Sequence, residues 1–137
     1  MIIEREYTIK TKILDSSIAI HTTPLEKIEF NDNLTITFDD EKFNRITKKF
    51  INVLSYKVTY EDVWDHDFMC EEAFYKDEEG NGRYRRCIYE LLDSKWLEEL
   101  KHNYEEVDAG IFERSVYHHY ILHLGDNILE VIAEKMV

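Results

Sequence analysis

The sequence has few of the residues that mark disulfide-stapled folds or common catalytic motifs. Its 137 residues include two cysteines, one proline and four glycines. Because disulfide frameworks belong to secreted, cysteine-rich chains, we expect Cys70 and Cys87 to be reduced thiols. The chain contains no glycine-rich phosphate loop, no Gly-x-Ser-x-Gly elbow and no His-Glu-x-x-His zinc motif. The sequence therefore predicts no catalytic residue and no cofactor, and it leans toward a protein that is not an enzyme, although triads also assemble from distant residues.

Basic residues and long apolar runs are also scarce. Lys and Arg number 17 against 29 Asp and Glu, which gives a formal net charge of −12. Nucleic acids and anionic membranes are bound through clustered Lys and Arg, so this charge argues against both as partners. It is compatible with a basic protein partner, a metal ion or solubility alone. No apolar run approaches the roughly 18 residues of a membrane span, and residues 1–6 carry charges where a signal peptide needs an apolar core. We therefore expect a cytoplasmic protein.

The length and apolar content of the chain are typical of one folded domain. Apolar residues make up 44% of the chain, enough for a single core. Residues 6–14 and 34–38 alternate between apolar and polar positions, the pattern of half-buried strands. The turn-forming residues 31–33 precede the second run and predict a hairpin with residues 28–30. We expect a single compact domain over residues 1–137.

The strongest structural signal lies at the C-terminal end of the chain. Residues 117–124 and 127–133 are rich in strand formers, and the Gly125-Asp126 pair between them fits a tight hairpin turn. Together with the upstream strands, this hairpin predicts an α+β domain built on an antiparallel β-sheet, with strong curling of the sheet left open.

One clear helix is predicted to pack on this sheet. Asp93-Ser94 supplies an N-cap, since Asp and Ser side chains accept hydrogen bonds from the first free backbone N–H groups of a helix. The apolar positions that follow recur at helical spacing. The predicted buried stripe consists of Trp96, Leu97, Leu100 and Tyr104.

Residues 43–60 carry two conflicting patterns. Phe43, Ile46 and Phe50 fall at helical spacing. Residues 45–50 also alternate, however, and residues 53–60 are rich in strand formers. We favour two strands, or one long bent strand, over a helix.

Residues 61–79 form an acidic segment with interleaved aromatic residues. Lys76 is its one basic residue. Clustered like charge costs folding stability, which a useful binding surface would offset, and aromatic residues are common binding hot spots. An equally weighted alternative is that Trp64 and Phe68 fill the core while the acids face water. The candidate partner-binding residues are Trp64, Asp65, Asp67, Phe68, Glu71 and Glu72.

Three residues near the C-terminus are weak candidates for metal ligands. His119 and His123 are four residues apart, the spacing of a metal pair on a helix. On a strand they share a face but lie about 13 Å apart at ~3.3 Å per residue, so they cannot share one ion. Each could bind a metal with a carboxylate such as Glu130 across the hairpin. We favour the alternative of partly buried histidines with hydrogen-bonded rings, and we predict no metal.

Several short segments resemble a small family of uncharacterised bacterial proteins. These segments are residues 50–59, residues 93–97, His119-Tyr120 and residues 130–133, so the resemblance covers the last two thirds of the chain. Such proteins are loosely grouped with contact-dependent toxin-immunity proteins. The resemblance implies a similar order of strands and helix, and it carries no catalytic residue.

The sequence supports three functional hypotheses. The first is a non-catalytic protein that binds a basic protein partner, such as a toxin, through an acidic and aromatic face. The second is a metal- or small-molecule-binding protein that uses the cup of a curled sheet lined by Tyr117, His119, His123 and Glu130. The third is a homo-oligomer that pairs through a sheet edge or an apolar face.

Overall fold

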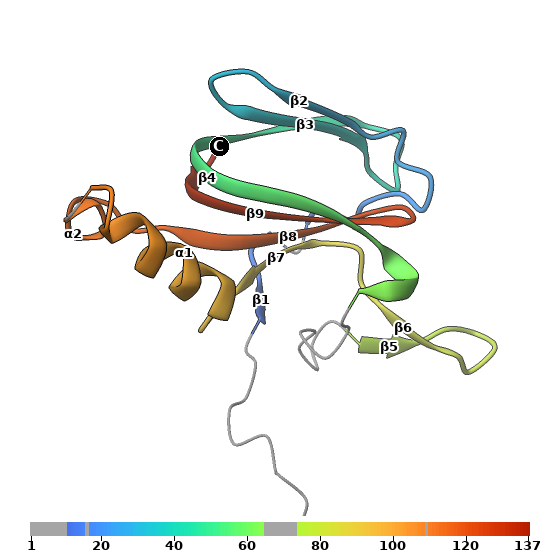
Figure 1. Ribbon diagram of the computed structural model, residues 1–137. Helices are drawn as coiled ribbons and strands as arrows, with labels where there is room; N and C mark the ends of the chain where they lie inside the picture. The colour runs from blue at the N-terminus through green and yellow to red at the C-terminus, as the bar shows by residue number, and fades with distance from the viewer. Residues whose placement is uncertain (1–10, 16, 65–73, 109) are drawn as a thin grey trace, which may run out of the picture.

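The chain folds into an open, mostly antiparallel β-sheet with a helix at one end (Figure 1). The computed structural model describes residues 11–15, 17–64, 74–108 and 110–137. Seven strands form the sheet in the order β1-β7-β8-β9-β4-β3-β2, and β5 and β6 form a separate two-stranded hairpin. The strands are β1 (Thr11–Ile13), β2 (Lys27–Phe30), β3 (Leu34–Asp39), β4 (Arg45–Tyr60), β5 (Phe74–Lys76), β6 (Gly82–Tyr84), β7 (Ile88–Leu91), β8 (His118–Leu124) and β9 (Asn127–Met136). The helices are η1 (Glu61–Val63), α1 (Lys95–Glu105) and α2 (Ile111–Arg114). The α+β prediction is thus confirmed.

Strands β8 and β9 lie at the centre of the sheet because most of their side chains are apolar or aromatic. They pair antiparallel from His118 opposite Ala133 to Leu124 opposite Asn127. Gly125 follows β8 with a φ of 65°, a left-handed conformation that glycine adopts without a Cβ clash. Both strands are buried along most of their length, as expected for strands covered on two faces.

Strand β4 resolves the conflict in residues 43–60. It is one strand of 16 residues, so the helical alternative is wrong and the long bent strand is confirmed. Its register with β9 shifts between Val53 and Ser55, and Asn52 has a φ of 54°. Such a bulge inserts an extra residue into one strand and bends it. Pairing with β3 at residues 45–50 and with β9 at residues 50–60 outweighs the helical spacing, because these partner strands satisfy backbone N–H and C=O groups along the strand.

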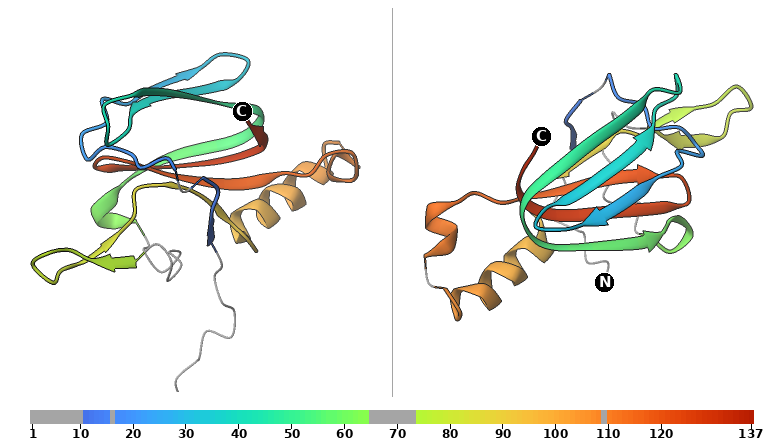
Figure 2. Two further views of the ribbon diagram at one scale, coloured as in Figure 1. Left: turned by 180° about the vertical axis from the view of Figure 1, so that it is seen from behind. Right: turned by 90° about the horizontal axis from the view of Figure 1, so that it is seen from above.

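The bend in β4 turns β2 and β3 over one face of β8 and β9 (Figures 1 and 2). The sheet is open, since β1 and β2 occupy its two ends in the described part of the chain. The sequence did not decide whether the sheet is strongly curled. The structure shows no strong curling, because the strands change direction mainly at the bulge in β4. The main core fills the space between the two layers. It includes Leu34, Ile36 and Phe38 of β3, Leu122 and Leu124 of β8, and Leu129 and Val131 of β9, all fully buried.

Helix α1 begins as predicted but packs more loosely than predicted. Ser94 is its N-cap, and the Leu97 backbone N–H donates to Ser94 Oγ at 3.0 Å. None of the residues of α1 is fully buried, and Tyr104 is 37% exposed. The predicted buried stripe is therefore only half-buried, because the later turns of α1 run on toward α2 beyond the strands (Figure 1). No helix among the described residues is long and apolar enough to cross a membrane.

Candidate functional site

A buried polar network joins α1 to the two central strands. His119 of β8 lies between two partners: its Nδ1 is 2.6 Å from Ser94 Oγ, and its Nε2 is 2.9 Å from Glu130 Oε1. These three side chains are at most 4% exposed. Lys57 of β4 adds a cation whose Nζ lies 3.7 Å from Glu130 Oε2 and 4.3 Å from the centre of the Trp96 ring. The network therefore connects β4, β8, β9 and the start of α1.

The network keeps the Glu130 carboxylate ionised in a buried position. Desolvation raises the pKa of Glu130, but this effect is outweighed chiefly by the hydrogen bond and charge of His119 and by the charge of Lys57. The net result is a pKa of Glu130 below its ordinary value. A buried carboxylate is tolerated only when such partners replace the water it has lost.

A serine, a histidine and a carboxylate in a row also form the residue set of a hydrolase triad. Here Ser94 Oγ already accepts the N–H of Leu97, and all three side chains are buried. Two pockets among the described residues, one beside the β5–β6 hairpin and one beside Pro24, are lined by none of the three. We interpret the network as a structural contact that holds α1 against the sheet.

The structure brings together two of the three metal-ligand candidates. His119 and Glu130 are hydrogen-bonded, whereas His123 lies in a different environment. The His123 ring packs edge-on against Trp64 and Tyr89, with ring centroids 5.6 and 5.8 Å away. Among the described residues, no three His, Cys, Asp or Glu side chains are grouped as a metal site would require. Tyr117, the fourth residue of the predicted cup, is also buried.

One of the predicted partner-binding residues lies in the described structure. Trp64 follows η1, is 6% exposed, and belongs to a second apolar cluster with Tyr89, Ile121 and Ile128. Its ring is thus a core side chain. The remaining candidates, Asp65, Asp67, Phe68, Glu71 and Glu72, lie outside the described residues.

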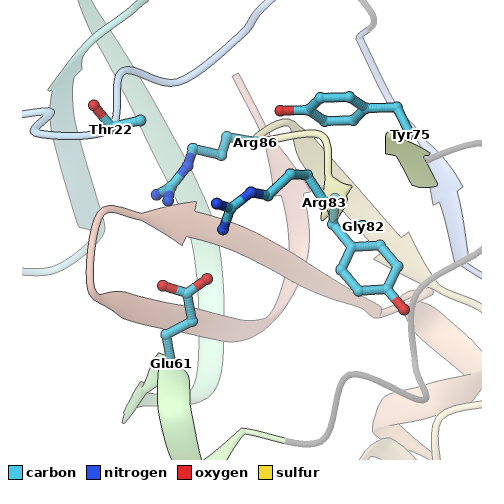
Figure 3. A pocket seen from close by; sticks show the side chains of 7 residues that line it. Thr22, Glu61, Tyr75, Gly82, Arg83 and Arg86 are labelled. Atoms are coloured by element: carbon cyan, nitrogen blue, oxygen red, sulfur yellow. The ribbon is translucent and has the colours of Figure 1, made fainter. Parts of the chain in front are cut away.

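A pocket of about 570 Å³ lies beside the β5–β6 hairpin and is closed on its other sides by Thr22, Glu61 and Arg86. Figure 3 shows the Arg83 and Arg86 guanidinium groups and the Glu61 carboxylate turned toward the same space. Arg83 Nε pairs with Asp77 Oδ2 at 3.2 Å, and Arg86 donates to the Gly125 carbonyl at 3.0 Å. Two guanidinium groups suit a carboxylate or phosphate ligand, but Glu61 and Asp77 offset their charge.

The second half of β4 forms an edge of the sheet. Strand β3 pairs with β4 from Arg45 to Phe50, whereas β9 pairs with it as far as Tyr60. Among the described residues, no strand pairs with residues 51–60 on the side away from β9. The right-hand view of Figure 2 shows this light-green half of β4 as the outer margin of the layer formed by β8, β9 and β4. Half of the backbone N–H and C=O groups of such an edge point away from the sheet.

Apolar side chains are exposed along the same half of β4. Tyr56, Val58 and Tyr60 share one strand face and are 39%, 48% and 54% exposed. Phe30 of β2 is 58% exposed and stacks on Tyr56 with a centroid distance of 5.6 Å. These four side chains form a continuation of the main core that the β2–β3 layer leaves uncovered. Contiguous exposed apolar side chains of this kind mark interaction sites.

Carboxylates lie around Tyr60, the last residue of this exposed row. The charges of Asp62 and Asp126, partial desolvation, a hydrogen bond to Asp62 and the charge of Glu61 together raise the pKa of Tyr60. The Glu61 backbone N–H donates to the Asp126 carbonyl at 2.8 Å, which holds η1 against the β8–β9 turn. We refer to Phe30, Tyr56, Val58, Tyr60, Asp62 and Asp126 as the β4 surface. It presents apolar rings beside negative charge.

Sequence reasoning found parts of these sites but did not assemble them. It named Ser94 as a helix cap and placed Glu130 within reach of His119, and it missed Lys57. The exposure of Tyr56 and Tyr60 was also missed, because it depends on where β3 stops. The signal in the sequence is the alternation of residues 56–60, which was used only to predict a strand.

Comparison of the chain with family models, with curated proteins and with solved structures gave no match.

Proposed function

We propose that this protein is a non-catalytic binding protein that holds a basic protein partner at the β4 surface. The observation that carries the proposal is the exposed row Tyr56, Val58 and Tyr60 beside the carboxylates of Asp62 and Asp126. Aromatic side chains supply contact area at little entropic cost, and neighbouring carboxylates select a cationic partner and speed its approach. The formal net charge of −12 acts in the same direction.

The concrete form of this proposal is a toxin-immunity role. In that role the carboxylates would occupy the cationic groove of a nuclease-like toxin and block its substrate. The acidity of the chain and its size support this version. Asp65, Asp67, Glu71 and Glu72 follow Asp62 closely in sequence, and they remain proposed contact residues together with Phe68. Trp64 is no longer among them, because its ring belongs to the core.

Native mass spectrometry of the protein purified from its own host at low salt tests this proposal. We expect a complex with a basic protein that dissociates as salt is raised, because opposite exposed charges are screened. The variant D62N/D126N should weaken this complex by about tenfold, since two rim charges each contribute up to ~1 kcal/mol. The control variant E99Q/E105Q removes the same charge from the exposed face of α1 and should leave the complex unchanged.

The proposal fails in either of two cases. The first is a bare chain at low salt, with no basic partner. The second is an equal response to the two double variants, which would assign the effect to net charge and not to the β4 surface.

A second candidate function is the binding of a small anion in the pocket beside the β5–β6 hairpin. The observation in its favour is the presence of Arg83 and Arg86 on the wall of that pocket. Calorimetric titration with citrate and with inorganic phosphate tests it. Binding that the variant R83Q weakens would support this function, and heats equal to those of dilution would exclude both anions as ligands.

A further inference from the structure

The open edge of β4 indicates how a partner would be held. Among the described residues, the seven-stranded sheet has edges at β1, at β2 and along the second half of β4. Strand β1 has three residues and β2 has four. Short length is one of the means by which proteins protect sheet edges from unwanted pairing. Residues 51–60 of β4 offer a longer edge.

Charge protects β2 but not the second half of β4. On β2, Lys27 and Glu29 form an exposed ion pair at 3.2 Å. On β4, Lys57 is the one charged residue between residues 55 and 60; its side chain is 49% exposed, and its ammonium group pairs with Glu130 and lies over the Trp96 ring. The bulge lies at Val53 and Ser55, before the row of exposed apolar side chains begins. Apart from Lys57, which is engaged by Glu130, this part of the edge lacks the usual obstacles to strand addition.

We propose that the partner binds by strand addition: an extended segment of the partner pairs antiparallel with residues 55–60 of β4. This inference rests on the proposed function and specifies its binding mode. Backbone hydrogen bonds to the open edge would hold the segment, and its apolar side chains would pack on Phe30, Tyr56 and Val58. Antiparallel pairing is the mode of every strand pair in this sheet.

The charges fix the chemistry and direction of the partner segment. Asp62 and Asp126 lie near the C-terminal end of β4, beside Tyr60. An antiparallel strand begins where its neighbour ends, so its N-terminal residues would face these carboxylates. The segment is therefore basic at its N-terminal end, followed by alternating β-branched or aromatic residues. A second copy of this chain fits poorly, because each copy has a formal net charge of −12.

Synthetic peptides of about ten residues, the length of a strand, test this inference. The first peptide has an arginine-rich N-terminal end followed by alternating valine and threonine. The second has the same sequence with N-methyl groups on consecutive central residues, which block pairing along both of its edges but keep charge and side chains. The third replaces arginine by glutamate. Affinities come from fluorescence anisotropy, and backbone contacts from amide hydrogen exchange of the full chain.

Strand addition predicts that the first peptide binds at least about tenfold more tightly than the other two. It also predicts slower exchange for amides within residues 55–60 when the first peptide is bound. Equal, salt-sensitive binding of the first two peptides would overturn strand addition and leave the proposed function standing. Equal affinity of the first and third peptides would contradict the proposed preference for a basic partner, and with it the proposed function. A concentration-dependent dimer that protects the same amides would instead make a second copy the occupant.

Discussion

His119 Nε2 lies 2.9 Å from Glu130 Oε1, and both side chains are 3% exposed. The two residues sit on neighbouring strands, with His119 opposite Ile132 and Glu130 opposite Ile121. They therefore meet diagonally across the pair, within the reach of long side chains. Because this contact leads through Ser94 to α1, it couples the only long helix among the described residues to the middle of the sheet.

Removing the imidazole of His119 should destabilise the protein strongly. In H119A, the Glu130 carboxylate stays buried and loses its closest partner. Breaking a buried pair from one side costs about 3–5 kcal/mol. Urea denaturation followed by tryptophan fluorescence measures the loss. The variant H118A is the matched control, because His118 is half-buried and pairs with Glu90 on the other face of the same strand. Equal losses in the two variants would contradict the special role of His119.

The lowered pKa of Glu130 predicts a loss of stability in acid. The unfolded chain binds a proton at Glu130 near pH 4.5, the ordinary value, whereas the native carboxylate takes it up only at lower pH. The unfolded state therefore binds more protons in this window, and the contribution of Glu130 is present above about pH 4.5 and is lost as pH falls through the native pKa.

The variant E130Q isolates this contribution of Glu130. Unfolding free energies of wild type and E130Q, measured between pH 7 and pH 2, should differ most at neutral pH and converge in acid. Other carboxylates titrate in both proteins and cancel in the difference. A difference that does not change with pH would show that the pKa of Glu130 is the same in the native and unfolded states, which contradicts the lowered native pKa.

Removing the Ser94 hydroxyl should affect both the helix and the network. S94A loses the N-cap bond to the Leu97 N–H and the hydrogen bond to His119. An N-cap is worth about 1 kcal/mol and a buried, newly unpaired group about 1–3 kcal/mol, so a total loss of about 2 kcal/mol or more is expected. K95A changes the exposed neighbour and should stay within about 0.5 kcal/mol of wild type. A loss of similar size in both would argue against the network.

Gly125 should tolerate a methyl group less well than Gly80 does. Both glycines have left-handed backbones, with φ of 65° and 81°. A Cβ at Gly125 would also lie 3.0 Å from Pro24 Cδ and 3.2 Å from the Thr22 carbonyl, whereas a Cβ at Gly80 meets nothing within 4 Å. Placing alanine in this left-handed backbone conformation costs about 1–2 kcal/mol of stability in each variant. G125A should therefore lower the thermal midpoint more than G80A, and equal shifts would assign the whole effect to the backbone.

Much of the fold follows from local sequence patterns. The alternation of residues 34–38 predicts β3, and Asp93-Ser94 predicts the start of α1, because period and capping are properties of neighbouring residues. The conflict in residues 43–60 could not be settled in this way, since both patterns are present in the same residues. Pairing of β4 with β9, a strand about 75 residues later, decides it.

The candidate sites depend almost entirely on tertiary structure. The composition determined that the chain is acidic, and the preference for a basic partner over nucleic acid is a prediction from that charge. The joining of Ser94, His119 and Glu130 depends on sheet register and on the place where α1 docks. The exposure of Tyr56 and Tyr60 depends on β3 ending its pairing at Phe50. Local patterns specify which residues favour a strand or a helix, whereas the burial and the neighbours of a side chain are set by segments far away in the sequence.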